Sequence, residues 1–192
     1  MGSFEINPMP GTLEGRPEVV DKLDQLAQMK LIVLDIDGTL TDGQIMYSGD
    51  GDVQRYNVHD GQGLVWLRRF AGMKQAWISG RSGPAAIRRS GDLKIDEVHL
   101  GVGPKAQVLQ EVQKKLGIGP EHTISMGDDL PDLALAAHSA LFVAPKNARI
   151  ELIKRADFVT KKGGGKGAVR EVCEWLLYAQ GQWPKILEEN GG

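Results

Sequence analysis

An unbroken apolar run, residues 31–34, ends abruptly in carboxylates and glycines. Because the run is short, aliphatic and without polar alternation, it predicts a strand that is covered on both faces, as in a parallel sheet. Ligands of such sheets bind at the carboxyl ends of the strands, and residues two apart in an extended chain point the same way. We therefore expect Asp35 and Asp37 to face one ligand, although a lone Asp-x-Asp-Gly is also an ordinary turn.

The rest of the chain alternates helical and strand patterns, which predicts an α/β fold with a doubly wound, mostly parallel, Rossmann-like sheet. The further strands are expected at residues 74–78, 98–100, 123–126, 141–143 and 158–160. The helices are expected at residues 18–29, 64–70, 84–90, 104–116, 131–137 and 148–154. Gly117 directly after one of these helices suits a left-handed C-terminal residue.

The sequence pattern changes after the first predicted strand. Residues 44–47 and 53–58 flank a glycine- and aspartate-rich turn, which predicts a β-hairpin at about 44–58. With Met46, Tyr47 and Tyr56 on it, this protruding hairpin is expected either to cap the site or to pair with another subunit. A hairpin without function is the alternative.

The length of 192 residues suits one domain with a real core. Residues 1–16 lack periodicity and predict a flexible N-terminal arm, followed by a single domain over 17–180 and a C-terminal tail over 181–192.

The formal net charge of −2 and the absence of a long basic run give no support for nucleic-acid binding. No stretch resembles a membrane span or a signal peptide, so we expect a cytoplasmic protein that does not contact a membrane. The single Cys173 lies at helical spacing among apolar residues and is expected to be a packed core thiol. The four histidines share no metal-ligand spacing.

Polar residues follow three further predicted strands. Ser79-Gly80-Arg81 offers a hydroxyl, a close backbone approach and a guanidinium suited to oxyanions. Lys105 stands at the start of a predicted helix, where the helix dipole disfavours a cation. A bound anion or exposure to solvent would compensate for this.

The last of these strands ends in Gly-Asp-Asp-Leu-Pro-Asp, which contains Asp128, Asp129 and Asp132. One aspartate is explained as a helix cap, but three are not. Crowded carboxylates repel one another unless a proton or cation relieves them, and hard oxygen ligands are those that Mg²⁺ prefers. The segment therefore predicts a magnesium site.

In this order, Asp-x-Asp-Gly, Ser-Gly-Arg, Lys and Gly-Asp-Asp-x-x-Asp resemble the motifs of the haloacid dehalogenase superfamily of phosphotransferases. The resemblance implies that Asp35 is the nucleophile that forms an aspartyl-phosphate, and that Asp37 is the general acid and base. It assigns Mg²⁺ to the carboxylates of Asp35 and Asp128 and to the main-chain carbonyl of Asp37. Ser79 and Lys105 are implied to clamp the phosphoryl oxygens.

The same resemblance leaves Asp129 and Asp132 outside the metal's own ligands. They are expected to orient Lys105 or metal-bound water, or to cap the helix.

Members of that superfamily often insert a cap domain between these motifs, but the intervals here hold only a hairpin, helices and strands, so the chain resembles a capless member. Residues 37–43, the hairpin and residues 57–63, 126–129, 163–173 and 176–181 closely resemble the phosphatases of 3-deoxy-D-manno-octulosonate 8-phosphate, which serve lipopolysaccharide synthesis. The similarity implies a homotetramer in which the hairpins associate and a neighbouring subunit completes the active site. Its glycine-rich segment, residues 163–167, is expected to fold over an acidic sugar phosphate and to bring Lys166 to it; a plain loop before the last helix is the alternative.

The substrate contacts are implied less directly. Gly80, Arg81, Asp60 and His59 are expected to bind substrate, with Arg81 and Lys166 as candidates for its carboxylate. His59 stands where this family commonly has arginine, so a nine-carbon 2-keto sugar acid 9-phosphate remains an alternative substrate.

Two other classes of protein share part of this pattern. A phospho-accepting signalling domain also phosphorylates an aspartate beside Mg²⁺, but it lacks an acid two residues beyond the acceptor and places its lysine after the acidic residues. A catalytically silent oligomeric module would keep the fold and the hairpin; the full set of acidic groups argues against it.

Overall fold

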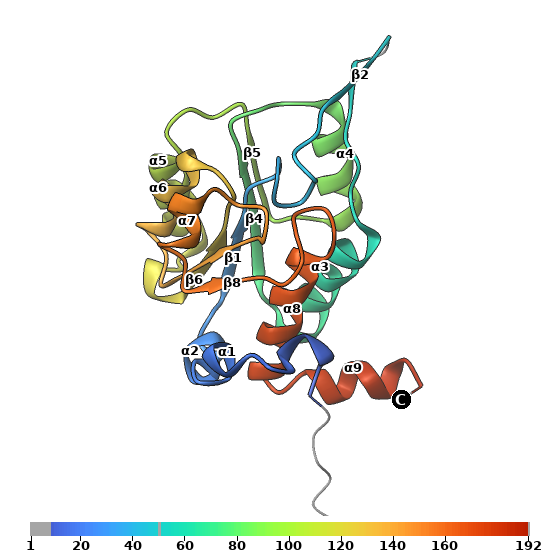
Figure 1. Cartoon of the computed structure of the whole chain (residues 1–192), viewed down its shortest axis with the longest axis vertical. Coiled ribbons are helices and arrows are strands. Elements are labelled where there is room, and N and C mark those ends of the chain that lie inside the picture. The colour runs from blue at the N-terminus through green and yellow to red at the C-terminus, as the bar shows by residue number, and fades with distance from the viewer. Residues whose placement is uncertain (1–8, 50, 192) are drawn as a thin grey trace, which may run out of the picture.

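The computed structural model describes residues 9–49 and 51–191, and it contains one sheet of six parallel strands (Figure 1). The strands are β1 (Leu31–Leu34), β4 (Lys74–Ser79), β5 (Glu97–Leu100), β6 (Thr123–Met126), β7 (Leu141–Ala144) and β8 (Phe158–Val159). Their order is β5-β4-β1-β6-β7-β8. The chain moves outward from β1 through β4 to β5 and then crosses back to β6 on the other side of β1. This reversal is the switch point of a doubly wound sheet and confirms the predicted fold class.

Strand β1 lies at the centre of the sheet and is buried on both faces. Ile32 and Leu34 belong to one apolar cluster, whereas Leu31 and Val33 belong to another, and none of the four is accessible to solvent. Leu34 pairs with residues of both neighbouring strands, so β1, β4 and β6 end at nearly the same level. The residues that follow these strands are therefore brought to one edge.

Helices cover both faces of the sheet. They are α1 (Pro17–Val20), α2 (Leu23–Ala27), α3 (Val58–Ala71), α4 (Pro84–Leu93), α5 (Lys105–Leu116), α6 (Leu133–Ala136), α7 (Ile150–Ile153), α8 (Ala168–Ala179) and α9 (Trp183–Glu189). The 3-10 turns are η1 (Gly11–Leu13), η2 (Pro120–His122) and η3 (Leu130–Asp132). Helices α3 and α8 pack on one face of β1, and α5 and α6 on the other (Figure 1).

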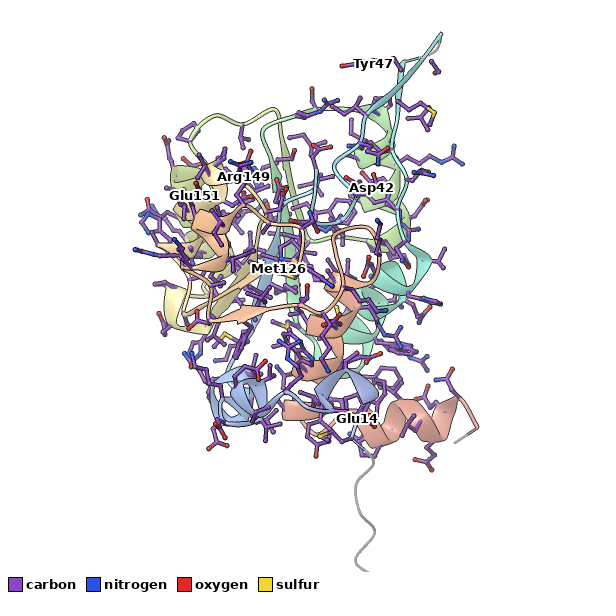
Figure 2. All side chains as sticks on the ribbon, viewed as in Figure 1. Glu14, Asp42, Tyr47, Met126, Arg149 and Glu151 are labelled. Atoms are coloured by element: carbon purple, nitrogen blue, oxygen red, sulfur yellow. The ribbon has the colours of Figure 1, made fainter. Side chains whose placement is uncertain are left out.

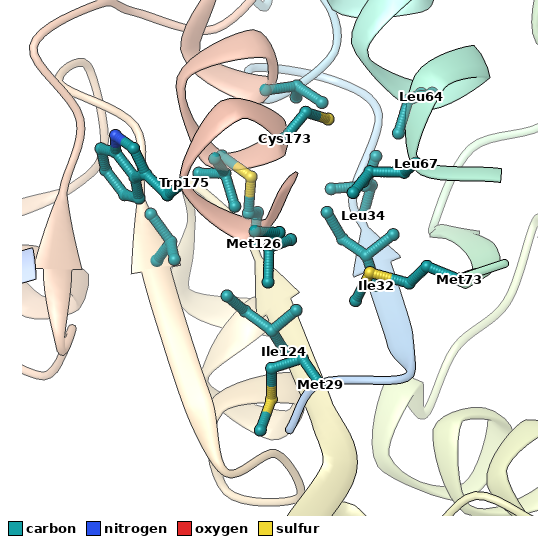
Figure 3. Close-up of a cluster of buried hydrophobic side chains, with 14 of the residues drawn as sticks. Met29, Ile32, Leu34, Leu64, Leu67, Met73, Ile124, Met126, Cys173 and Trp175 are labelled. Atoms are coloured by element: carbon teal, nitrogen blue, oxygen red, sulfur yellow. The ribbon is translucent and has the colours of Figure 1, made fainter. Parts of the chain in front are cut away.

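The cluster beneath α3 and α8 is the larger part of the core. Figure 3 shows Leu64 and Leu67 of α3 facing Ile32 and Leu34 of β1, with Cys173 of α8 close by. Cys173 is fully buried, as its spacing predicts, and burial raises the pKa of its thiol well above the ordinary value. It is a core residue and not an exposed nucleophile.

Two predicted helices differ in extent. The helix expected at 18–29 is divided into α1 and α2, because the backbone leaves the helical region at Lys22. The helix expected at 64–70 begins earlier, at Val58, where the side chain of Asn57 accepts a 2.8 Å hydrogen bond from the backbone amide of His59 and caps the first turn.

The predicted N-terminal arm is wrong for its described part, and residues 1–8 lie outside the described range. Leu13 is buried in the core, and the guanidinium of Arg16 lies 4.8 Å above the ring of Trp175. A 3-10 turn carries no helical periodicity, so the sequence pattern could not reveal this packing. The expected C-terminal tail also contains a packed helix, α9, in which Trp183 and Ile186 are buried.

The segment His59-Asp60-Gly61-Gln62-Gly63, expected to lie beside the substrate, forms the first turns of α3 instead. A Cβ atom on Gly63 would lie 2.9 Å from the Cβ of Cys173, closer than real Cβ contacts allow. Glycine at this position is therefore explained by the close packing of α3 against α8.

The predicted hairpin is present as β2 (Met46–Ser48) and β3 (Gly51–Val53), which pair antiparallel. It protrudes from the body of the molecule in Figure 1, and Figure 2 shows Tyr47 far from Met126 of the sheet. The side chains of Met46 and Tyr47 are 57% and 79% exposed. Among the described residues, the intervals β1–β4 and β4–β5 contain only this hairpin and single helices, which agrees with the predicted absence of a cap domain.

No helix in the described part of the chain is long and apolar enough to cross a membrane.

Two helical glycines offer a matched test of the α3–α8 packing. Gly63→Ala is expected to lower the free energy of unfolding by about 1–3 kcal/mol, because the added methyl group meets Cys173. Gly91→Ala is expected to raise it by about 0.5–1 kcal/mol, because Gly91 is exposed in α4 with open space around it. Urea unfolding curves measure both, and an equal stabilisation by the two changes would contradict the close packing.

Candidate active site

A cavity of about 240 Å³ lies at the carboxyl edge of the sheet. The residues that line it are Asp35, Asp37, Ser79, Gly80, Arg81, Lys105, Asp128, Asp129, Pro131 and Asp132. They come from the ends of β1, β4 and β6 and from the start of α5, which follows β5. The structure thus brings together the polar residues that the sequence places after four different strands.

Lys105 lies between two buried carboxylates. Its Nζ is 2.5 Å from Oδ1 of Asp35 and 2.6 Å from Oδ1 of Asp132, and all three side chains are at most 7% exposed. Burial lowers the pKa of Lys105, but the attraction of Asp35 and Asp132 outweighs it, so the pKa is raised overall. The positive charge of Lys105 at the helix start is therefore compensated by carboxylates of the protein itself. A bound anion is not needed to account for its position.

Asp132 organises the loop after β6. While Oδ1 accepts from Lys105, Oδ2 accepts hydrogen bonds from the backbone amides of Asp128 and Asp129 at 3.0 and 3.2 Å. Both oxygens are used within the protein, so Asp132 holds its neighbours in place. Asp129 is a cap: its Oδ1 accepts from the amide of Leu130 at 2.8 Å.

Asp128 is different, because its Oδ1 is buried and has no hydrogen-bond partner. Carboxylate oxygens of Asp35, Asp128 and Asp132 all lie within 4.8 Å of one another. Burial and then repulsion by Asp132 raise the pKa of Asp35 to about 8, and the same two causes raise the pKa of Asp128 to about 7. Unsatisfied hard oxygens held this close suit a divalent cation. The carboxylate of Asp37 does not belong to this cluster, so a contribution of Asp37 would come from its main-chain carbonyl.

Gly38 makes the close approach of Asp128 possible. Its φ of +93° favours glycine, and a Cβ atom there would collide with the Asp128 carboxylate. On its other side, the carbonyl of Gly38 accepts a 2.9 Å hydrogen bond from Nδ2 of Asn147, whose Oδ1 accepts from the amide of Gly164.

The glycine-rich segment 163–167 lies against its own chain. The amide of Gly165 donates to the carbonyl of Thr39 at 3.2 Å, and a Cβ atom on Gly164 would collide with the carbonyl of Gly38. This packing supports the loop that carries Asp37. The expectation that the segment folds over a sugar in a neighbouring site concerns a second subunit and stays a prediction.

The carboxylate of Asp37 faces the cavity from the end of β1. Its Oδ2 lies 3.5 Å from Oγ of Ser79 and 3.8 Å from Nε of Arg81. Its Oδ1 accepts a 2.8 Å hydrogen bond from Nε2 of Gln54, a residue just after β3 that the sequence analysis missed. Only the i, i+2 spacing of Gln54 and Tyr56 in the extended segment gave a signal, since it puts both side chains on one side.

Three expected substrate contacts lie away from this cavity. Asp60 is buried and accepts hydrogen bonds from the backbone amides of Gly167 and Arg170 at 3.3 and 2.7 Å, so it caps α8 and is not available to substrate. Burial raises its pKa to about 6. His59 and Lys166 line a separate cavity of about 410 Å³ beside α8. Within one chain, neither reaches the Asp35 cavity.

Residues 75–171 match a family model described as haloacid dehalogenase-like hydrolase. Over 176 residues the chain is 36% identical to the 3-deoxy-D-manno-octulosonate 8-phosphate phosphatase KdsC of Escherichia coli, covering 91% of this chain and 92% of the relative. Two solved structures of such phosphatases are also similar. That of Moraxella catarrhalis, in complex with magnesium ion, phosphate ion and a KDO molecule, is 37% identical with a TM-score of 0.84, covering 88% of this chain and 98% of that one.

The cobalt-bound deoxy-D-mannose-octulosonate 8-phosphate phosphatase of Haemophilus influenzae is 36% identical with a TM-score of 0.79, covering 82% of this chain and 92% of that one. Sequence and fold therefore agree over most of both chains. On these matches, the chain belongs to the haloacid dehalogenase-like hydrolases and, within them, to the family of the 3-deoxy-D-manno-octulosonate 8-phosphate phosphatases.

Proposed function

We propose that this protein is a Mg²⁺-dependent phosphatase that hydrolyses 3-deoxy-D-manno-octulosonate 8-phosphate to the free sugar acid and phosphate, a step of lipopolysaccharide synthesis. The observation that carries the proposal is the buried Asp35, which is paired with Lys105 and lies within reach of the unpartnered Asp128 oxygen. The relatives that act on this compound support the choice of substrate.

The carboxylates of Asp35 and Asp128 and the main-chain carbonyl of Asp37 would hold the metal. When bound, Mg²⁺ supplies positive charge that lets a carboxylate approach a phosphate dianion. The orphan Oδ1 of Asp128 supports this set of ligands, since a buried carboxylate oxygen without a partner is costly. The three hydrogen bonds that the carboxylate of Asp132 accepts within the protein make it less suited to the metal than the carboxylate of Asp128.

Asp35 attacks phosphorus and forms an aspartyl-phosphate, while the bond from phosphorus to the sugar oxygen breaks. Asp37 gives its proton to that leaving oxygen and afterwards accepts a proton from the water that hydrolyses the intermediate. Ser79 and Lys105 bind the phosphoryl oxygens and limit the charge that accumulates there. Asp132 keeps Lys105 in position for this role, as their 2.6 Å contact supports.

The size of the cavity suggests that it holds only part of the substrate. About 240 Å³ is small beside the roughly 300–1,000 Å³ of usual ligand pockets, so the cavity suits the phosphoryl group better than a whole sugar acid. The sugar would extend past Gly80 toward Arg81, whose side chain is 38% exposed and therefore accessible to the substrate carboxylate. A nine-carbon 2-keto sugar acid 9-phosphate remains the alternative substrate, because His59 departs from the family's usual arginine.

A cavity that leaves the sugar uncovered also supports completion of the site by a neighbouring subunit, in a cytoplasmic homotetramer. The exposed apolar side chains of the hairpin, Ile45, Met46, Tyr47 and Val53, are suited to such an interface. In that assembly His59 and Lys166, which miss their own chain's cavity, would be presented to a neighbour's substrate.

The first test of the activity is phosphate release with Mg²⁺ and with EDTA over the octulosonate 8-phosphate, nonulosonate 9-phosphates and hexose phosphates. We expect strong preference for the octulosonate and loss of activity in EDTA. Asp35→Asn is expected to lower kcat by more than about 10³-fold with an unchanged fold, because the nucleophile is lost. Preference for a nine-carbon acid would change the substrate, and no hydrolysis of any compound would leave a signalling domain or a silent module.

The crowded carboxylates also predict how stability depends on pH. Because the pKa values of Asp35 and Asp128 are raised in the folded protein, the stability that these groups contribute is present below the ordinary aspartate range and is lost as pH rises through about 7 and about 8. Without metal, we expect Tm to fall between about pH 4 and about pH 8, because over this range the unfolded chain has lost these protons while the folded protein still holds them. Added Mg²⁺ should raise Tm more at the higher pH, because ligand ionisation favours binding.

Differential scanning calorimetry measures these shifts. Asp128→Asn is the matched variant, since it removes one titrating group and one metal ligand; its Tm should depend less on both pH and Mg²⁺. A Mg²⁺ effect of equal size at both pH values would contradict the ionisation of these groups.

Assembly is tested by sedimentation at several protein concentrations. Met46→Asp is expected to dissociate the tetramer, because it puts a charge into the proposed hairpin interface. Ile150→Asp is the control, since Ile150 is similarly exposed, 54% against 57%, but lies on α7 away from the hairpin. A tetramer that survives Met46→Asp, or an unmodified protein that is monomeric, would rule out this interface.

A further inference from the structure

We propose that Gln54, held by Tyr56, is a positioning residue for proton transfer: it binds Oδ1 of Asp37 and leaves Oδ2 as the oxygen that carries the transferred proton. The inference rests on the proposed role of Asp37 as acid and base. It adds to the active site two residues that directly follow β3 of the hairpin.

The contacts of Asp37 are unequal. Gln54 Nε2 lies 2.8 Å from Oδ1, an ordinary hydrogen-bond length, whereas Ser79 and Arg81 lie 3.5 and 3.8 Å from Oδ2. Gln54 is therefore the tightest side-chain contact that fixes the orientation of this carboxylate. The oxygen that it leaves, Oδ2, is the one directed toward two cavity-lining residues.

The orientation of the Gln54 amide follows from its other partner. The phenol of Tyr56 lies 2.9 Å from Oε1 of Gln54. The amide oxygen accepts this phenolic proton, so the amide NH₂ group must face Asp37. While Asp37 is ionised, the alternative orientation would direct the amide oxygen at the carboxylate, with two acceptors facing each other.

Tyr56 is itself held by the sheet. Its ring stacks on that of Trp77 in β4, with centroids 6.1 Å apart and planes 10° apart, and Trp77 is fully buried. Gln54 and Tyr56 point the same way because they are two apart in extended chain, while Arg55 between them is 72% exposed and pairs with Asp42. A continuous series of contacts thus runs from the sheet through Tyr56 and Gln54 to Asp37.

The chemistry of the two Asp37 oxygens fits this arrangement. An amide N–H can only donate, so Gln54 requires an acceptor at Oδ1 whether Asp37 is ionised or protonated. The acidic proton must then lie on Oδ2. As the bond between phosphorus and the leaving oxygen breaks, that proton moves from Oδ2 to the leaving oxygen, and Asp37 becomes a carboxylate. In hydrolysis Oδ2 takes a proton from the attacking water, so the cycle is balanced.

Leaving groups of different acidity separate this role from a general effect on structure. An alkyl phosphate needs a proton on its leaving oxygen, whereas a nitrophenyl phosphate does not, since nitrophenolate is a stable anion. With Gln54→Leu we expect kcat/KM, which reports the steps up to departure of the leaving group, to fall roughly 10–100-fold for the sugar phosphate and to change by no more than about 3-fold for the nitrophenyl phosphate. Tyr56→Phe should give a smaller loss with the same dependence on the leaving group.

The matched control is Gln107→Leu, the same change at an exposed glutamine of α5 whose amide donates a 3.0 Å hydrogen bond to Glu111 on the same helix. It should not change kcat/KM for either substrate. Asp37→Ala separates the inference from the proposed function. If Asp37→Ala does not lower kcat/KM for the alkyl phosphate selectively, Asp37 is not the acid. If Asp37→Ala does so but Gln54→Leu leaves kcat/KM unchanged for both substrates, or lowers it equally for both, the positioning role of Gln54 is wrong. Urea unfolding of each variant shows whether the fold is intact.

Discussion

The placement of Lys105 between Asp35 and Asp132 is the interaction on which the rest of the site depends. Three ionisable side chains with almost no exposure are tolerated only because their charges and hydrogen bonds are matched. Removing one member of such a buried set typically costs about 3–5 kcal/mol, since the remaining charges lose their partner. The set also joins elements from three parts of the sheet, namely the end of β1, the start of α5 and the turn after β6. In the proposed mechanism, its geometry would define where the phosphoryl group lies.

One lysine does not neutralise all the carboxylates of the site. Lys105 balances part of the negative charge of Asp35, Asp128 and Asp132, and the raised pKa values of Asp35 and Asp128 reflect the remainder. A site that is strained in this way without a cation is well suited to bind one. A bound divalent cation would relieve this excess of negative charge.

The sequence predicted the sheet and the cavity residues well, because both follow from local pattern. Apolar runs such as 31–34 identify buried strands, and the carboxyl ends of parallel strands must meet at one edge. The sequence failed where contacts between distant segments decide the outcome. Leu13 is buried by a turn without periodicity, and Asp60 caps a helix that begins more than a hundred residues later. Gln54 was missed for the same reason, since nothing near it in the chain shows that its amide meets Asp37.

Gly38 lies between two parts of the chain that leave it no room. The carboxylate of Asp128 occupies one side, and the backbone of Gly164, held through Asn147, occupies the other. A Cβ atom at position 38 would meet the Asp128 carboxylate, and one at position 164 would meet the carbonyl of Gly38. Two positions far apart in the chain thus share one requirement: neither can carry a side chain without a shift of Asp128 or of the loop that carries Asp37.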